Sequence, residues 1–130
     1  MNKQFSIQNQ KGLTLMEIIA VLIILGILAA VAVPRYMAFE ANAKKKVFNK
    51  SINELNALET LEWSDNKISE SGYVSDIKIY GAINYDIGQD FTWNAGDPTL
   101  TGGTILFKGE SFALSRTPST TTKPAIWNRK

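Results

Sequence analysis

The chain contains neither cysteine nor histidine among its 130 residues. The lack of cysteine excludes disulfides, thiolate zinc sites and cysteine nucleophiles, and the lack of histidine excludes an imidazole base or metal ligand. No carboxylate pair stands in a recognisable catalytic motif either, so the sequence predicts a protein that is not an enzyme and uses no cofactor. The net charge of +2 is too small to indicate a nucleic-acid partner by itself.

A long uncharged run follows the first residues of the chain. Ile18–Val33 has no polar side chain, and the wider block Leu13–Val33 contains a single charge, Glu17. Twenty-one helical residues span about 31 Å, close to the roughly 30 Å of a bilayer's hydrocarbon core. The run is apolar on every side, unlike the amphipathic core helix of a small soluble domain. The sequence therefore predicts a membrane-spanning helix here.

A cleaved secretory signal is the alternative interpretation of the same run. Lys3 and Lys11 would form its basic start, Ile18–Leu28 its apolar core, and the Ala-Val-Ala sequence at 30–32 its cleavage site. Under this interpretation the chain would be an exported or membrane-anchored binding domain. Glu17 argues against it, because a carboxylate is costly at the start of the apolar core.

Glu17 is the one ionisable residue in the apolar block. An acidic side chain inside a membrane segment costs about 2.5–3.5 kcal/mol on insertion scales, so it requires a partner. The positions one helical turn further on are Ala20 and Val21, which offer no cation. We therefore expect Glu17 either to be protonated or to pair with a cation of another molecule, which indicates association between chains.

The sequence from Lys11 to Glu17 (KGLTLME), the apolar run and Pro34 resemble the N-terminus of type IV pilins and of the related pseudopilins of type II secretion. In this family a prepilin peptidase removes a short basic leader after a glycine and methylates the new N-terminal amine. The resemblance implies cleavage between Gly12 and Leu13, with methylation of Leu13. Glu17 and Pro34 then take the positions of the family's glutamate and proline, whereas Leu13 stands where phenylalanine is usual.

The resemblance implies a structural subunit of a type IV pilus. Such a subunit resides in the inner membrane, meets an assembly platform there, and polymerises into an extracellular homopolymeric filament. In such filaments the glutamate neutralises the N-terminal amine of a neighbouring subunit, which would supply the partner of Glu17, and the segment between Gly26 and Pro34 unwinds. A type II secretion pseudopilin is the alternative, since this chain lacks the C-terminal disulfide of many major pilins. Whether the filament serves adhesion, twitching motility, DNA uptake, secretion or electron conduction is left open.

Beyond Pro34 the apolar residues become periodic. No glycine or proline occurs at 35–71, and one stripe of helical spacing is formed by Met37, Ala41, Phe48, Ile52, Leu55, Leu58 and Leu61. We therefore predict one helix from about Leu13 to about Ser64. Its second half, 35–64, is amphipathic and suited to pack on a sheet.

Strand signals follow this helix. They occur at Val74–Tyr80, Phe91–Trp93, Thr104–Phe107 and Ser111–Ser115, with a hairpin turn at 108–110 and a polar tail at 118–124 that Trp127 would anchor. The sequence predicts an α+β, pilin-like fold in which a long N-terminal helix packs on three to four antiparallel strands. Its parts are a leader at 1–12, a membrane or filament-core segment at 13–34, the amphipathic segment and a head with a C-terminal tail at 65–130.

Charge is segregated along the amphipathic segment and the residues that follow it. A basic block of Arg35, Lys44, Lys45, Lys46 and Lys50 precedes an acidic block of Glu54, Glu59, Glu62, Asp65, Glu70 and Asp76. Both blocks can be solvated helix surface, or they can provide complementary charge between staggered subunits. Contact with DNA is the weaker interpretation, because a single basic patch without stacked aromatic residues is a poor nucleic-acid footprint.

Three aspartates, Asp86, Asp90 and Asp97, lie in a glycine-containing loop region. Oxygen ligands suit calcium, although the spacing fits no fixed calcium-loop motif. These aspartates are weak candidates for calcium ligands.

Overall fold

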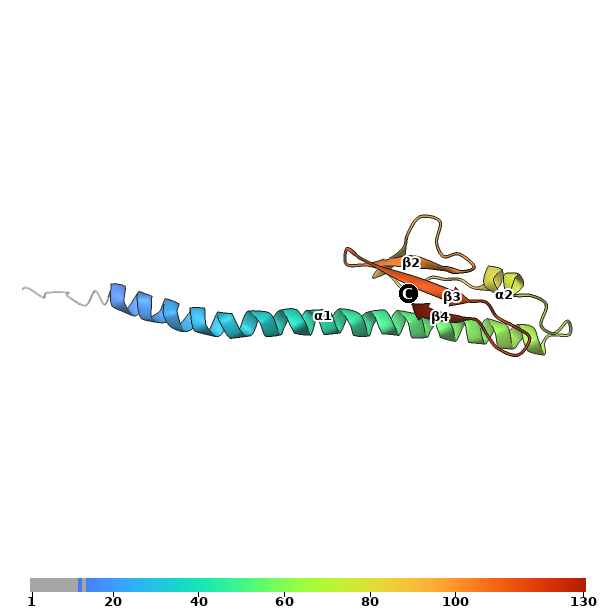
Figure 1. The fold of residues 1–130 in the computed structure, drawn as a ribbon, viewed down its shortest axis with the longest axis horizontal. Helices are drawn as coiled ribbons and strands as arrows, with labels where there is room; N and C mark the ends of the chain where they lie inside the picture. The colour runs from blue at the N-terminus through green and yellow to red at the C-terminus, as the bar shows by residue number, and fades with distance from the viewer. Residues whose placement is uncertain (1–11, 13) are drawn as a thin grey trace, which may run out of the picture. The chain divides into compact units, whose positions relative to one another are not determined.

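The computed structural model describes residues 12 and 14–130. In chain order the elements are α1 (Leu15–Ile68), α2 (Asp76–Ala82), β1 (Phe91–Trp93), β2 (Gly102–Phe107), β3 (Glu110–Thr117) and β4 (Ile126–Arg129) (Figure 1). The strands form one antiparallel sheet in the order β1-β2-β3-β4. The predicted α+β, pilin-like fold is thereby confirmed. The chain divides into two compact units, 1–43 and 44–130. From here on, the head means the whole second unit, which includes the C-terminal part of α1 as well as the predicted head at 65–130.

Helix α1 is continuous through Gly26 and Pro34. It ends at Ile68, four positions after the predicted end at Ser64. Two contacts extend it: the amide of Ser69 donates to the carbonyl of Asp65 at 3.2 Å, and the buried Asn66 accepts from the amide of Val74 at 3.4 Å. Turn-forming residue types thus remain helical where a buried side chain fixes the last turn.

The predicted strand Val74–Tyr80 is wrong, since this segment forms α2. Ser75 is the N-cap of α2, and its hydroxyl accepts a hydrogen bond from the amide of Lys78 at 3.3 Å. Asp76 then lies in the first turn, where a negative charge is favoured by the helix dipole. Ile79 is buried whereas Ile77 is 68% exposed, so the two isoleucines do not share one face. The capping signal outweighs the apparent alternation.

The predicted hairpin is confirmed. Phe107 and Glu110 pair across it, so Lys108 and Gly109 form a two-residue loop between β2 and β3. Both loop residues have positive φ, 47° and 81°, as a type I′ turn requires. Trp127 is fully buried on β4, which pairs with β3, and so anchors the C-terminal segment as predicted.

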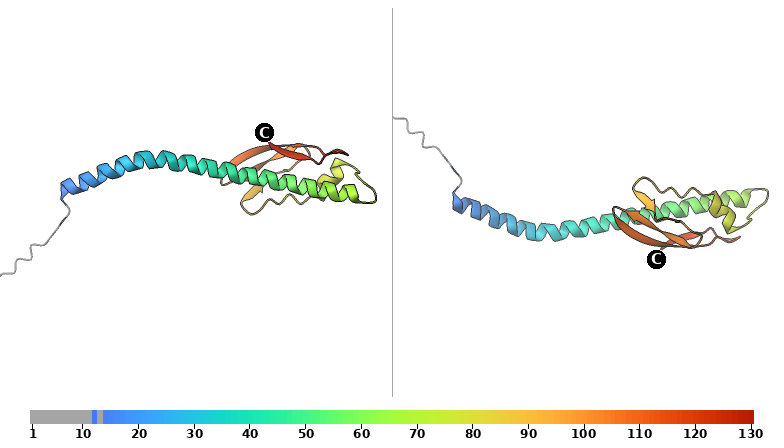
Figure 2. Two further views of the ribbon diagram at one scale, coloured as in Figure 1. Left: turned by 90° about the horizontal axis from the view of Figure 1, so that it is seen from below. Right: turned by 90° about the horizontal axis from the view of Figure 1, so that it is seen from above.

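The core of the head lies between α1 and the sheet. Its buried members are Phe48, Leu55, Ile87, Ile105, Leu114 and Trp127. Both views in Figure 2 show the strands running along the C-terminal part of α1. The predicted apolar stripe is right for Phe48 and Leu55 but wrong for Met37 and Leu61, which are 63% and 62% exposed. The buried face instead continues through two polar residues, Ser51 and Glu59.

Candidate functional site

The apolar part of α1 is uncovered in the single chain. From Leu15 to Val33 every residue is exposed, and Leu22 and Ile27 are more than 60% accessible. By length and composition this is a candidate membrane-spanning helix, and none of its apolar window is buried. A soluble core helix would be covered by its own domain. This surface therefore needs a cover of lipid or of other chains.

Glu17 has a partner within its own chain that the residue pattern had not revealed. The amide of Thr14 donates to Glu17 Oε2 at 2.8 Å, and the amide of Glu17 donates to Thr14 Oγ1 at 3.2 Å. The carbonyl of Thr14 accepts from the amide of Ile18 at 3.1 Å. These bonds form a capping box, in which a Thr at the N-cap and a Glu three positions later satisfy each other's amides. The Thr-x-x-Glu spacing could have predicted it.

Two of the other predicted processing and assembly positions, Gly12 and Gly26, have open space around them. A Cβ atom at Gly12 or at Gly26 would have no heavy atom within 4 Å, apart from chain neighbours and the helix backbone. Among the residues that the structure describes, none therefore requires glycine at either position. Leu13, the predicted methylation site, and the leader residues 1–11 lie outside the described residues.

Arg116 is the centre of a buried ionic network in the head. Its Nε and Nη2 donate to Glu59 Oε1 and Oε2 at 2.6 and 3.0 Å. Its Nη1 and Nη2 donate to Asp76 Oδ2 and Oδ1 at 2.8 and 2.9 Å, and Nη1 also reaches the carbonyl of Leu100 at 3.2 Å. All five N–H donors of the guanidinium are thus used. The network joins α1, α2, β3 and the loop before β2.

The two carboxylates of this network have further partners. Glu59 Oε1 accepts from the hydroxyl of Tyr85 and from Trp127 Nε1, both at 2.9 Å. Asp76 Oδ1 accepts from the amide and the hydroxyl of Ser119, both at 2.7 Å. The interpretation of Glu59 and Asp76 as solvated surface charges is therefore wrong. Their partners lie far away in the sequence, so no local pattern could have shown this pairing.

The pKa values of Tyr85, Asp76 and Arg116 are shifted both by burial and by the charged partners of each group. Burial raises the pKa of Tyr85, and the carboxylate of Glu59 raises it further. Burial alone would raise the pKa of Asp76, but hydrogen bonds from Arg116 and Ser119 outweigh it and hold that pKa below its usual range. Burial alone would lower the pKa of Arg116, and its two carboxylate partners raise it instead. The guanidinium therefore stays charged.

The lowered pKa of Asp76 predicts that the stability of the folded head decreases in acid. Because its pKa is lower in the folded chain than in the unfolded chain, its stabilisation is complete above the unfolded value of 3.8 and is lost as the pH falls through the folded value. Asp76→Asn should therefore be less stable than wild type at pH 7, and the difference should shrink below about pH 4. Thermal unfolding from pH 7 to pH 2 checks this. A stability difference independent of pH would contradict it.

The three aspartates predicted as calcium ligands do not share one site. Asp86 Oδ1 accepts from the amide of Gly88 at 3.0 Å, and Asp97 Oδ2 accepts from the amide of Thr104 at 2.8 Å. Asp90 and Asp97 line different clefts. Within the part of the chain that the structure describes, no group of three or more acidic side chains is placed to hold a metal ion. Calcium binding stays a prediction without an assembled ligand set.

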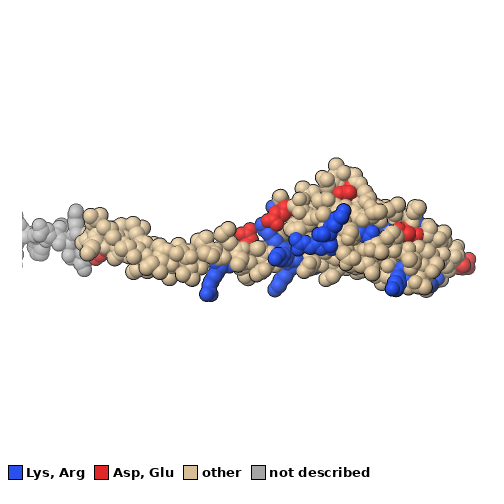
Figure 3. Space-filling view, in the orientation of Figure 1, with Lys and Arg blue, Asp and Glu red and all other residues tan. Residues whose placement is uncertain are grey.

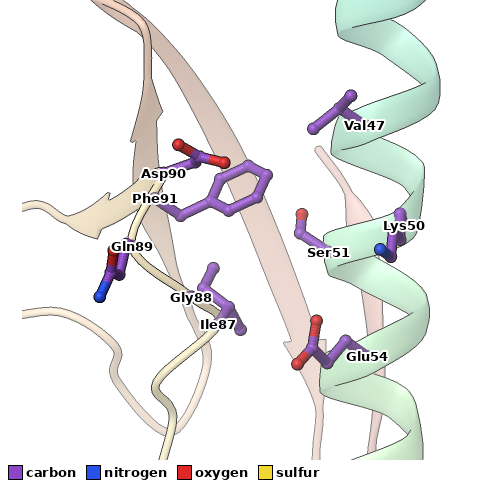
Figure 4. A pocket seen from close by; sticks show the side chains of 9 residues that line it. All are labelled: Val47, Lys50, Ser51, Glu54, Ile87, Gly88, Gln89, Asp90 and Phe91. Carbon is purple, nitrogen blue, oxygen red and sulfur yellow. The ribbon is translucent and has the colours of Figure 1, made fainter.

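The cleft that contains Asp90 has a volume of about 280 Å³ and lies between α1 and residues 87–91 (Figure 4). Val47, Lys50, Ser51 and Glu54 line it from the helix. The hydroxyl of Ser51 is already used, since it donates to the carbonyl of Phe48 at 2.7 Å. Figure 4 shows the carboxylates of Glu54 and Asp90 on opposite sides of the cleft. This mixture of charges defines no particular ligand.

Comparison with known proteins points to the N-terminal part of the chain. The family described as the prokaryotic N-terminal methylation motif matches residues 7–33. Two fimbrial proteins of Pseudomonas aeruginosa are each 34% identical to the chain over 79 residues, which make up 61% of this chain and 48% of each relative. The chain thus spans about half the length of the curated relatives it matches, and no solved structure matches it significantly.

The methylation motif, the similarity to fimbrial proteins and the long apolar helix packed on a four-stranded antiparallel sheet agree with one another. The chain therefore has a pilin-like fold, carries the N-terminal methylation motif and is similar to fimbrial proteins.

Proposed function

We propose that the chain is the structural subunit of a type IV pilus filament. A prepilin peptidase cuts it after Gly12 and methylates Leu13, and the assembly platform of the inner membrane then polymerises it through its apolar helix. The observation that supports this most is the uncovered apolar surface of Leu15–Val33, which coincides with the methylation motif at 7–33.

The proposed polymerisation exchanges lipid contacts for contacts between helices. Lipid tails are as apolar as leucine, so close packing rather than exclusion of water drives helix association in the bilayer. The apolar surface is nearly uniform and by itself fixes no register. A buried pair between Glu17 and the amine of a neighbouring Leu13 would fix it, because any other register leaves one charge without its partner.

Processing is tested by the mature N-terminus. Mass spectrometry of chains from the filament fraction should show methylated Leu13 as the first residue. Gly12→Val should remain uncut, since it places a branched side chain beside the bond to be cleaved, and should yield no filaments. Gly81→Ala, at an exposed position with open space for a Cβ, is the matched control. A mature N-terminus at Val33 would contradict the proposal and support a secretory signal.

The location of the assembled filament, outside the cell or within the cell envelope, distinguishes a pilin from a pseudopilin. The chain contains no cysteine, which keeps the pseudopilin alternative open. Electron microscopy with antibodies against the head should show long extracellular fibres that contain the chain. Confinement of the chain to the cell envelope, together with loss of protein secretion on its deletion, would instead support the pseudopilin.

A further inference from the structure

We propose that the aromatic side chains of Tyr36 and Phe39 bind the headgroup boundary of a lipid bilayer and thereby set the depth of α1 in the membrane before assembly. At this depth Glu17 lies at the opposite boundary of the bilayer. The inference rests on the proposed function, because it concerns the subunit while it resides in the membrane. The partner of the two rings is lipid, not another chain.

The two aromatic side chains stand uncovered directly after the apolar run. Tyr36 is 70% exposed and Phe39 is 72% exposed. Their spacing of three positions places them on one side of α1. Among the described residues, neither ring packs against another ring or a cation, and the hydroxyl of Tyr36 has no hydrogen-bond partner. Exposed aromatic surface of this size indicates a partner outside the chain.

The length of the apolar run places both rings at the level of the lipid headgroups. Leu15–Val33 is helical, and at 1.5 Å per residue it spans roughly 28 Å, close to the roughly 30 Å of hydrocarbon in a bilayer. Figure 3 shows an uninterrupted uncharged surface along this part of α1, between an acidic and a basic side chain. Tyr36 and Phe39 follow Val33 by roughly 5 and 9 Å. The headgroups occupy about 5–8 Å on each side of the hydrocarbon, so both rings reach them.

The residues next to the two rings match the chemistry of this boundary. A tyrosine is favoured there because its ring can lie among acyl chains while its hydroxyl reaches water. Arg35 is exposed and bonds no described residue, so its guanidinium is available to lipid phosphates. Pro34 has no amide hydrogen for the carbonyl of Ala30, a loss that is costly in hydrocarbon unless water is near. Each feature favours a boundary between Ala30 and Phe39.

The same depth gives Glu17 a polar environment before assembly. Glu17 precedes Tyr36 by 19 positions on one continuous helix, which corresponds to roughly 28 Å. When Tyr36 lies at one boundary of the bilayer, the carboxylate of Glu17 therefore lies near the other, within reach of water and headgroups. A carboxylate is much less costly there than at the centre of a membrane helix. The two rings thus keep Glu17 out of the hydrocarbon until a neighbouring subunit supplies its partner.

Depth measurements on spin labels test this anchor in the full-length chain. The chain is reconstituted at low density in vesicles of phosphatidylethanolamine and phosphatidylglycerol. It contains no cysteine, so a cysteine introduced at Ala20 or at Ala29, both exposed, carries the only label. The relative access of oxygen and of a water-soluble nickel complex to each label reports how deep it lies in the bilayer.

Three double variants are compared with wild type. Y36S/F39S removes both rings, and Y36W/F39W retains aromatic side chains at the same positions. L61S/I68S is the matched control, since it removes two apolar side chains that are 62% and 82% exposed but lie outside this segment.

Loss of the rings should move α1 along the membrane normal, because the segment after Pro34 becomes polar and shifts toward water. In Y36S/F39S the label at position 29 should become shallower and the label at position 20 deeper, each by about 2.7 Å or more, half a helical turn. Y36W/F39W and L61S/I68S should stay within about 1.5 Å of wild type, the rise of one residue.

Unchanged depths of both labels in Y36S/F39S would overturn the anchor alone. Changes of both labels in the same direction would also overturn it, because they would indicate a distorted helix instead of a displaced one. Loss of filaments at unchanged depth would show that the rings contact a neighbouring subunit and not lipid. Wild-type labels that both lie in water would instead overturn residence in the membrane, and with it the proposed function.

Discussion

Replacement of Arg116 by methionine is expected to lower the free energy of unfolding of the head by about 3–5 kcal/mol. The guanidinium has no exposed surface, and neither has the side chain of Glu59 that it binds. Without Arg116 the carboxylate of Glu59 stays buried with only two neutral donors, Tyr85 and Trp127. An uncompensated buried charge is among the most destabilising changes that a single substitution can cause.

Guanidinium denaturation of the full-length chain in detergent, followed by tryptophan fluorescence, measures this loss. Lys78→Met is the matched control, since it removes an exposed positive charge and should change stability by less than about 0.5 kcal/mol. The combination R116M/E59Q/D76N should recover at least half of the loss, because it removes the charges together while the amide oxygen introduced by E59Q would still accept from Tyr85 and Trp127. A loss below about 1 kcal/mol for Arg116→Met would show that the network contributes little.

The sequence correctly predicted elements whose formation depends on residues close together in the chain. The second half of the long helix follows from the run without glycine or proline at 35–71, and the turn at Lys108 and Gly109 follows from the strands on either side. The strand at Val74–Tyr80 was mispredicted because Ser75 and Asp76 form a helix start, which is also a local signal. The Thr14–Glu17 capping box is a third local signal and equally readable from spacing.

The ionic network could not be predicted in this way. Arg116 is 57 positions from Glu59 and 40 from Asp76 in the sequence, and all three residue types are normally exposed. Only the sheet register and the contact of the sheet with α1 bring them together. Arg116 lies two positions from the buried Leu114 in β3, so the strand alternation could have indicated that Arg116 is buried. The alternation does not show which residues pair with it.

Directed hydrogen bonds attach the C-terminal segment to the rest of the head. Residues 118–125 run between β3 and β4, and α1 holds them through Trp63 Nε1, which donates to the carbonyl of Thr120 at 2.8 Å. The hydroxyl of Tyr73 donates to the carbonyl of Ser119 at 3.0 Å, and Asp76 accepts two bonds from Ser119. Asn56 completes the attachment, because its side chain accepts from the amide of Trp127 and donates to its carbonyl. Several directed hydrogen bonds thus fix the segment without a covalent link.

Glu17→Gln is expected to abolish filaments while preserving the start of α1. Glutamine at the third helical position serves a capping box as glutamate does, so its bond with the amide of Thr14 is retained. The negative charge is lost, however, and the proposed pair with the amine of a neighbouring Leu13 cannot form. Removal of one member of a buried pair costs about 3–5 kcal/mol, so filament yield should fall by a hundredfold or more.

Thr14→Val separates the two roles of Glu17 in the opposite direction. It removes the hydroxyl that accepts from the amide of Glu17, which costs about 1 kcal/mol of helix capping, but it leaves the carboxylate in place. Filament yield from this variant should stay within about threefold of wild type, measured against the membrane-bound subunit pool by immunoblot. If Glu17→Gln assembled as well as wild type while Thr14→Val did not, the cap rather than the charge would set assembly. Because each variant changes one property of the same helix start, the pair decides whether Glu17 acts between subunits or within its own.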